Sequence, residues 1–380
     1  MAAAGFASMA SIRIADPMLP ALAAEFGGDP AQAAPVIVSF TIAYGVMQLV
    51  WGPLGDRLGK LRVLAWAALA ATLGTLACAL APSLDWLTAA RLLTGACCAA
   101  IIPLAIAHVG DTVAYEIRQA TLARLATGTL TGMIAGQVLG GLSADTVGWR
   151  VAFGVLAVVF LATGTAALRL AARQADTPRP AAVPALRGMA TVLRRGSARV
   201  LLGAAFAEGA LMFGALAFVP AWLHDRTGMT LSAAGGAVAA LGLGGLLYST
   251  NARRVIPRLG ERRLLALGGA LIAIGYTGVA LFARPPAGLA TFAAAMGGCG
   301  LAGVGFYMLH NTLQTLATQL APETRATAIG LFAVAIFIGQ SVGVALAARI
   351  APAVGHESVM IGAGLLLAAL GIALSRRRAS

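Results

Sequence analysis

The sequence predicts an all-α membrane protein with twelve transmembrane helices, arranged as two pseudo-symmetric six-helix bundles. The chain is 59% hydrophobic and 11% charged, whereas soluble domains carry roughly 45–50% apolar and about 25% charged residues. About twelve apolar windows are long enough to cross a bilayer. We expect helices, because a helix satisfies its own backbone polar groups in lipid. Motifs of the first half also recur in the second half at a nearly constant spacing.

The apolar windows follow one another along the whole chain. Their approximate edges are 3–23, 33–54, 63–81, 86–107, 123–144, 149–170, 200–222, 231–250, 264–283, 288–309, 325–348 and 355–374. The longest polar break contains three prolines and carries seven basic residues from Arg169 to Arg199. It predicts an N-terminal bundle at 1–170, a cytoplasmic linker at 171–199 and a C-terminal bundle at 200–380.

The basic residues lie between the windows and not along one face of a soluble domain. The net charge of +13 therefore does not indicate binding to nucleic acid. With both termini in the cytoplasm, 21 of the 27 lysines and arginines fall on the cytoplasmic side and four on the outer side, as the positive-inside rule requires. Lys60 is the only lysine, a bias typical of a high-GC bacterium. We expect a multi-pass protein of the bacterial inner membrane, with 3–23 as a first span and not a signal peptide.

The two halves of the chain repeat each other. The matching elements are Leu58-Gly59-Lys60 with Leu259-Gly260-Glu261 at an offset of 201, Gly132-x-x-x-Gly136 with Gly339-x-x-x-Gly343 at 207, and Pro20 with Pro220 at 200. Such offsets predict a parallel duplication about an axis along the membrane normal. A protein built in this way binds its substrate near the midplane, between the halves, and works by rocking them.

A charged stretch, Gly52 to Leu64, joins the second and third windows. It carries Asp56, Arg57, Lys60 and Arg62, and its glycines permit a tight turn or a close helix approach. We predict a short charged turn on the cytoplasmic side. In the second half Pro257 stands where Asp56 would fall, so the acid is present in one half only.

Four motifs resemble those of the major facilitator superfamily, and the resemblance covers nearly the whole chain. Gly52 to Leu64 is similar to that family's signature between spans 2 and 3. Asp16-Pro-Met-Leu-Pro20 resembles the span-1 motif of twelve-span drug:proton antiporters, and Arg91-Leu-Leu-Thr-Gly95 resembles the arginine motif of span 4. Gly132 to Gly141 resembles the antiporter motif of span 5, with Gln137 in place of the usual proline. The sugar-efflux and multidrug-efflux branches are the most similar.

The resemblance implies a conformational gate in the charged stretch. Asp56 would hold the cytoplasmic ends of the two halves together when the cavity faces outward, through arginines and the start of span 11. The candidate gate residues are Gly52, Asp56, Arg57, Gly59, Lys60 and Arg62.

Four charged residues fall inside predicted spans and are candidates for proton coupling: Arg13, Asp16, Arg91 and Glu208. A charge at the bilayer centre costs about 2.5–3.5 kcal/mol on insertion scales, so such residues face a partner or a water-filled cavity. Arg13 and Asp16 are three residues apart and can pair on one helix face. Burial favours a neutral carboxylate and a nearby arginine favours an ionised one, so a moving arginine would switch the acid between holding and releasing a proton. A structural ion pair is the alternative.

Span 10 carries a polar stripe at helical spacing, formed by Tyr307, Asn311, Gln314 and Thr318 beside His310. It predicts either a hydrated face that binds substrate or bonds between helices. Tyr44 and Gln48 form a smaller polar pair with the same two readings. The full set of candidate substrate-binding residues is Tyr44, Gln48, Gln137, Phe213, Phe306, Tyr307, His310, Asn311 and Gln314.

We expect a monomeric secondary transporter that exports a small organic compound (a drug, a sugar or a metabolite) in exchange for protons. A proton symporter or facilitator for uptake, and a non-transporting sensor, are the alternatives. The four cysteines lie inside apolar windows without metal-ligand spacing, so we expect no metal site. The chain has no Gly-rich phosphate loop and no His-Glu-x-x-His pattern. We therefore expect no ATP-driven pump, no intramembrane enzyme and no cofactor.

Overall fold

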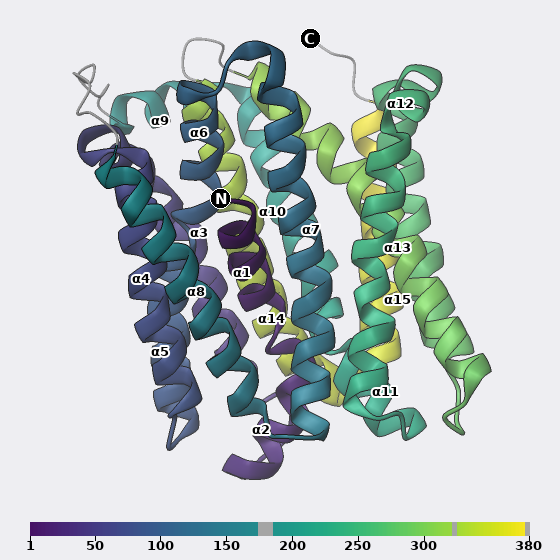
Figure 1. Cartoon of the computed structure of the whole chain (residues 1–380). Coiled ribbons are helices and arrows are strands. Elements are labelled where there is room, and N and C mark those ends of the chain that lie inside the picture. Colours follow the sequence, from purple (N-terminus) through teal and green to yellow (C-terminus); the bar gives the residue numbers. More distant parts are fainter. Residues whose placement is uncertain (174–184, 321–324, 377–380) are drawn as a thin grey trace.

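The computed structural model describes residues 1–173, 185–320 and 325–376, and their regular structure is helical (Figure 1). The elements are α1 (Ala2–Arg13), the 3₁₀ helix η1 (Asp16–Met18), α2 (Leu19–Phe26), α3 (Pro35–Leu58), α4 (Lys60–Ala79), α5 (Leu84–Cys98), α6 (Ile101–Thr112), α7 (Tyr115–Asp145), α8 (Trp149–Ala172), α9 (Ala185–Arg194), α10 (Gly196–Leu216), α11 (Val219–Thr227), α12 (Leu231–Phe282), α13 (Leu289–Gln319), α14 (Arg325–Val354) and α15 (His356–Arg376). Helix α9 lies inside the segment predicted as a linker, and the division of the chain at 171–199 stays a prediction.

Within the described ranges, ten helical segments are long and apolar enough to cross a membrane. Two further spans account for the predicted twelve. Helix α12 is 52 residues long and breaks at Gly260, so it supplies two antiparallel spans. The first span is divided among α1, η1 and α2, each too short to cross a membrane alone.

The break in the first span corrects the continuous helix expected at 3–23. Pro17 and Pro20 each remove a backbone donor, and proline ends or kinks a helix at such positions. The seventh span breaks at the matching place, because α10 ends at Leu216 and α11 begins at Val219 beside Pro220. Both spans therefore change direction inside the bundle, and the first break positions Asp16.

The charged turn predicted at Gly52 to Leu64 is shorter than expected. Helix α3 continues through the charged residues to Leu58, and α4 begins at Lys60. The turn is therefore Gly59 alone, with φ of 100°. Gly260, its counterpart in the second half, has φ of 70°. L-residues rarely adopt these angles, so the sequence repeat extends to the backbone conformation of both glycines.

Glycines on α7 bring it close to α1. A Cβ atom added at Gly132 or Gly136 would lie 2.2 or 2.5 Å from a carbonyl oxygen of α1, and one added at Gly140 would lie 2.2 Å from the carbonyl oxygen of Ile14, the C-cap of α1. The same construction joins α14 to α10, where Cβ atoms at Gly339 and Gly343 would lie 2.1 and 2.0 Å from carbonyl oxygens of α10. The glycine pattern is therefore a packing device that both halves use.

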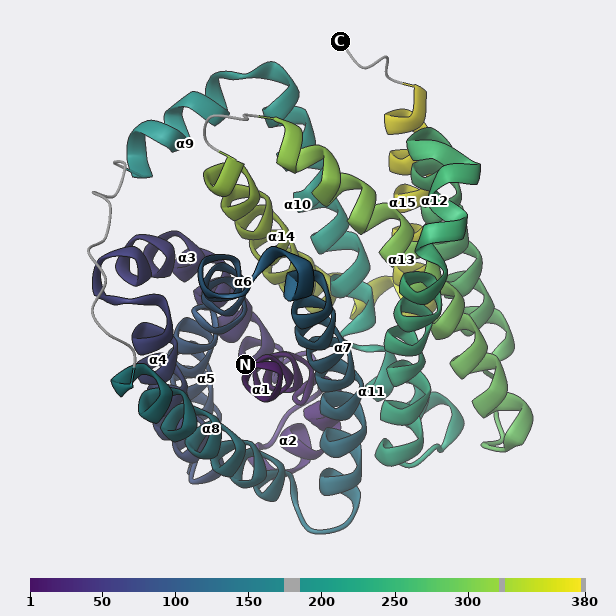
Figure 2. The ribbon, with the colours of Figure 1, turned by 45° about the horizontal axis from the view of Figure 1, so that its top comes forward.

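The two halves of the chain meet along two seams, α7 against α12 and α3 against α14. The seams include Gly235, whose added Cβ would lie 2.5 Å from the Gln137 carbonyl oxygen, and the ring of Tyr44, 4.4 Å from that of Phe337. We call the end that carries α9 and the last turn of α15 the linker end, and the opposite end the far end. The ribbons of α7 and α12 are closer at the far end and diverge toward the linker end (Figures 1 and 2).

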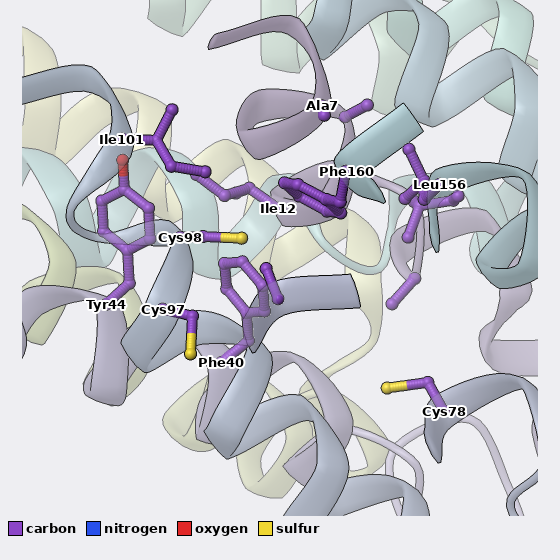
Figure 3. Close-up of a cluster of buried hydrophobic side chains, with 14 of the residues drawn as sticks. Ala7, Ile12, Phe40, Tyr44, Cys78, Cys97, Cys98, Ile101, Leu156 and Phe160 are labelled. Carbon is purple, nitrogen blue, oxygen red and sulfur yellow. The ribbon is translucent and has the colours of Figure 1, made fainter. Parts of the chain in front are cut away.

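Each half has its own apolar core. Cys78, Cys97 and Cys98 lie among buried apolar side chains of the first half, including Phe40 and Phe160 (Figure 3). Cys299 is buried in the core of the second half. This placement fits helix packing.

Polar contacts tie down the far end of the first half. The Trp149 indole and the Arg150 guanidinium donate to Glu25 at 2.7 and 2.8 Å. Partial burial by itself raises the pKa of Glu25, but these hydrogen bonds and the charge of Arg150 outweigh it and lower the pKa below its ordinary value.

Candidate functional site

Asp16 lies at the break between α1 and η1 and is fully buried. Its Oδ2 accepts a hydrogen bond from Gln137 Nε2 at 2.9 Å and pairs with Arg13 Nη1 at 3.5 Å. Its Oδ1 is buried without a partner among the described residues. The predicted pair of Arg13 and Asp16 is therefore present, with Gln137 as a third member.

Arg13 connects this acid to the second half of the chain. Its Nη2 donates to Gln340 Oε1 on α14 at 3.4 Å, and its guanidinium lies 4.1 Å from the ring centroid of Phe213 on α10. Arg13 and Phe213 are 200 residues apart, the same offset as the two prolines of the repeat. Equivalent positions of the two halves therefore touch at the interface.

Gln137 and Gln340 form the polar neighbourhood of this pair. Sequence reasoning proposed Gln137 for substrate binding, and the structure places it on Asp16. Sequence reasoning did not propose Gln340, although a glutamine directly after Gly339 in an apolar span was a readable signal. A void of about 10 Å³ borders Arg13 and Gln137, room for about one water molecule.

Arg91 has different partners. It donates to the carbonyl oxygens of Ser11 and Val36 at 2.8 and 3.2 Å, and it stacks over Phe40 at 4.0 Å. These contacts join α5 to α1 and α3, as expected of an arginine that stabilises helix packing. Its role in proton coupling stays a prediction.

Glu208 and His310 form a second polar centre, within the second half. Glu208 is fully buried on α10, and its Oε2 lies 3.2 Å from His310 Nδ1 on α13. The imidazole stacks on Phe306 with ring centroids 5.1 Å apart, and Phe306 contacts Phe213 at 5.1 Å. A chain of contacts thus runs from Asp16 through Arg13, Phe213, Phe306 and His310 to Glu208. Sequence reasoning paired Arg13 with Asp16 but did not pair Glu208 with His310.

The polar stripe on α13 runs from this centre toward the linker end. Tyr307, His310 and Asn311 are partly exposed, and Gln314 is exposed. Polar side chains on a membrane helix suit a protein interior or a water-filled space better than lipid. On α3, Gln48 is partly exposed, whereas Tyr44 is 1% exposed at the α3–α14 seam.

The predicted gate lies at the linker end. Asp56 pairs with Lys60 at 3.4 Å, and Lys60 also pairs with Asp111 of α6. The expected contact of Asp56 with the start of span 11 falls partly outside the described residues, which resume at 325. The gate role of Gly52, Asp56, Arg57, Gly59, Lys60 and Arg62 stays a prediction.

A cavity of about 450 Å³ opens at the linker end between α1, α4, α6 and α8. Alanine and leucine side chains form most of its wall. It is lined by none of the predicted site residues, so it is separate from the two polar centres.

Comparison with known proteins places the chain among transporters. A sequence model described as "Major Facilitator Superfamily" matches residues 1–344. An uncharacterized MFS-type transporter of Bacillus subtilis, YceJ, is 25% identical over 94% of this chain and 90% of its own length. A probable transporter of Streptomyces coelicolor, SCO4007, is 30% identical over 91% of this chain and 79% of its own length. A putative multidrug resistance protein, MdtD, of Cronobacter sakazakii is 32% identical over 41% of this chain and 33% of its own length.

Solved structures agree on the fold. The nucleoside transporter NupG superposes with a TM-score of 0.78 over 98% of both chains, at 14% identity. The POT family transporter PepTSo superposes with a TM-score of 0.79 over 98% of this chain and 95% of that chain, also at 14% identity. Identities this low show the fold alone.

Proposed function

The chain belongs to the Major Facilitator Superfamily and is a multi-pass secondary transporter, and from this premise we propose that it exports a small organic compound in exchange for protons. The observation that carries the proposal is the place of Asp16. This acid is buried at a helix break, and the arginine paired with it also contacts the other half of the molecule.

Protonation of Asp16 would change the contacts between the halves. An ionised Asp16 satisfies both the Gln137 amide and the Arg13 guanidinium. A neutral Asp16 leaves Arg13 as a buried cation without its counter-charge, which is strongly unfavourable. Arg13 then gains by moving toward Gln340, toward water or toward a bound anionic group. Because Arg13 touches α10 and α14, this movement acts on the interface that alternating access must open and close.

Export is favoured over uptake by two resemblances. Asp16-Pro-Met-Leu-Pro20 resembles the span-1 motif of drug:proton antiporters, and one relative is a putative multidrug resistance protein. Gln137, in place of the usual proline of the span-5 motif, favours the second candidate, a proton-coupled importer. The two use the same acid and differ in which protonation state opens which face.

In the proposed topology, the linker end faces the cytoplasm of a bacterium and the far end faces outward, as the basic residues of the sequence indicate. Helices α7 and α12 lie closer together at the far end than at the linker end. We therefore assign the structure to a state that is closed on the outer face of the membrane.

Purified protein in liposomes tests the direction of transport. A panel of drugs, sugars and metabolites is offered with a pH gradient imposed in each direction. We expect the cargo to move against the direction of the protons. Movement of cargo together with protons would establish the importer, and flux independent of the gradient would contradict coupling.

We propose that Glu208 orients His310, which contacts the cargo. Glu208→Gln and His310→Asn are each expected to raise the Kd for the cargo about tenfold, because each breaks the same buried pair. The double variant should bind no more weakly than either single variant, a coupling of about 1.4 kcal/mol. The measurement is equilibrium binding to the purified protein, and additive losses would show that the two residues act independently.

A further inference from the structure

A carboxylate of the first half holds the first turn of a helix in the second half. Asp145, the last residue of α7, accepts hydrogen bonds from the backbone N–H groups of Leu231 and Ser232 at 3.1 and 2.6 Å. The Ser232 hydroxyl also donates to Asp145 at 2.6 Å. Leu231 is the first residue of α12, so the acid sits at the N-terminus of that helix.

These bonds satisfy groups that a helix cannot satisfy by itself. The first N–H groups of a helix have no partner within it, and a negative charge there interacts favourably with the helix dipole. Thr230, the N-cap of α12, accepts from the N–H group of Ala233 at 3.2 Å. Two of the first three N–H groups of α12 thus bond to Asp145, and only the third bonds to a residue of its own half.

The backbones approach closely beside this acid. A Cβ atom added at Gly141, one turn before Asp145, would lie 2.2 Å from the carbonyl oxygen of Leu231. Separation of α7 from α12 at the far end therefore breaks the three hydrogen bonds of Asp145 and opens this contact.

We propose that Asp145 is the latch that holds the far end of the transporter closed. Opening of that face requires α12 to lose its hydrogen bonds to Asp145. The free energy of these bonds therefore favours the state that is open at the linker end. The proposal goes beyond the coupling role of Asp16. It concerns the balance between the two faces and holds whichever ion drives transport.

The acid of the latch occurs in only one of the two sequence repeats. The residue 207 positions after Asp145 is Pro352, which has no side-chain acceptor. At the linker end the same asymmetry occurs, because Asp56 has Pro257 as its counterpart. Each end of the molecule thus carries an acid of the first half whose counterpart in the repeat is a proline, and at the closed end that acid binds a helix N-terminus.

Distances between spin labels on the two halves test the latch. Cysteines replace Val147, after α7, and Asp225, on α11, which are both exposed at the far end. The native cysteines are buried and leave the added pair as the labelled sites. Without the latch, we expect the ratio of far-end-open to far-end-closed molecules to rise about tenfold in Asp145→Ala, the effect of losing a strong helix cap. Asp145→Asn keeps one acceptor oxygen but loses the charge, and it should raise the ratio about threefold. Ser232→Ala removes one bond of the three and should raise the ratio about threefold.

Asp85→Asn is the matched control. Asp85 also lies in the first turn of a helix, α5, and is exposed, but its helix and its neighbours in sequence belong to one half. It should leave the distances unchanged. Unchanged distances in both Asp145→Asn and Asp145→Ala would overturn the proposal, as would an equal shift in Asp85→Asn. The distances are measured without an ion gradient, so failure of the coupling role of Asp16 would leave this result standing.

Discussion

Asp16→Asn is expected to abolish transport driven by a pH gradient while the protein stays folded and still exchanges cargo at equal pH. Asparagine has nearly the shape of aspartate and can still accept from Gln137, which lies 2.9 Å from Asp16 Oδ2. The asparagine amide does not titrate at physiological pH, so the contact of Arg13 with residue 16 no longer depends on the proton gradient. Exchange needs no change of protonation and should continue.

The measurement compares two assays on the same proteoliposomes. Uphill accumulation under an imposed pH gradient should fall to the level of protein-free liposomes, and counterflow at equal pH should remain. Asp29→Asn, at an exposed acid in the turn after α2, serves as a control and should change neither assay. Undiminished gradient-driven accumulation in Asp16→Asn would remove Asp16 from the coupling mechanism.

Local patterns were sufficient to predict the membrane class, the spans and the pair of Arg13 and Asp16. Hydropathy reports span length directly, and a spacing of three residues brings two side chains to one helix face. The break that places Asp16 was readable in Pro17 and Pro20, but apolar windows alone predict a continuous helix. The sequence predicted a longer turn around Gly59, because its charged residues were expected to lie in the turn. Charged residues such as Asp56 can instead extend a helix beyond the membrane, as they do at the end of α3.

The long-range partners could not be predicted from the sequence. Gln340 meets Arg13 across 327 residues, and His310 meets Glu208 across 102. Both contacts depend on which faces of packed helices converge, which one sequence does not reveal. The role of Gln137 in substrate binding stays a prediction, and the sequence did not reveal that its amide reaches Asp16 through the close packing of α7 on α1.

The glycines around Gly136 can be interpreted either as a functional motif or as a helix-packing motif. The span-5 glycines resemble an antiporter motif, yet α14 packs on α10 through Gly339 and Gly343 in the same way. The recurrence shows that the glycines are required for helix packing in both halves. The polar residues beside them, Gln137 and Gln340, differ in register and are the ones that reach the buried charges.

Gly132→Ala and Gly140→Ala are expected to destabilise the protein strongly, by about 1–3 kcal/mol each, as overpacking of a close contact does. Each new Cβ would lie 2.2 Å from a carbonyl oxygen, that of Phe6 in α1 and that of Ile14 at its C-cap respectively, so α1 and α7 must move apart. Gly154→Ala on α8 is the matched control, because an added Cβ there meets no atom within 4 Å. It should be neutral or slightly stabilising, since alanine favours a helix over glycine. Thermal unfolding of the purified proteins measures the difference.

The two destabilised variants should differ in function at equal amounts of folded protein. Gly140 also faces Pro17, whose Cγ would lie 2.8 Å from the new Cβ, so Gly140→Ala displaces the break that holds Asp16. Gly132 packs farther along α1, on Phe6, away from that acid. We therefore expect Gly140→Ala to lose gradient-driven transport more than counterflow, and Gly132→Ala to lose both in proportion to its stability. Equal ratios of the two activities in both variants would show that the α1–α7 contact supports the fold without setting the geometry of Asp16.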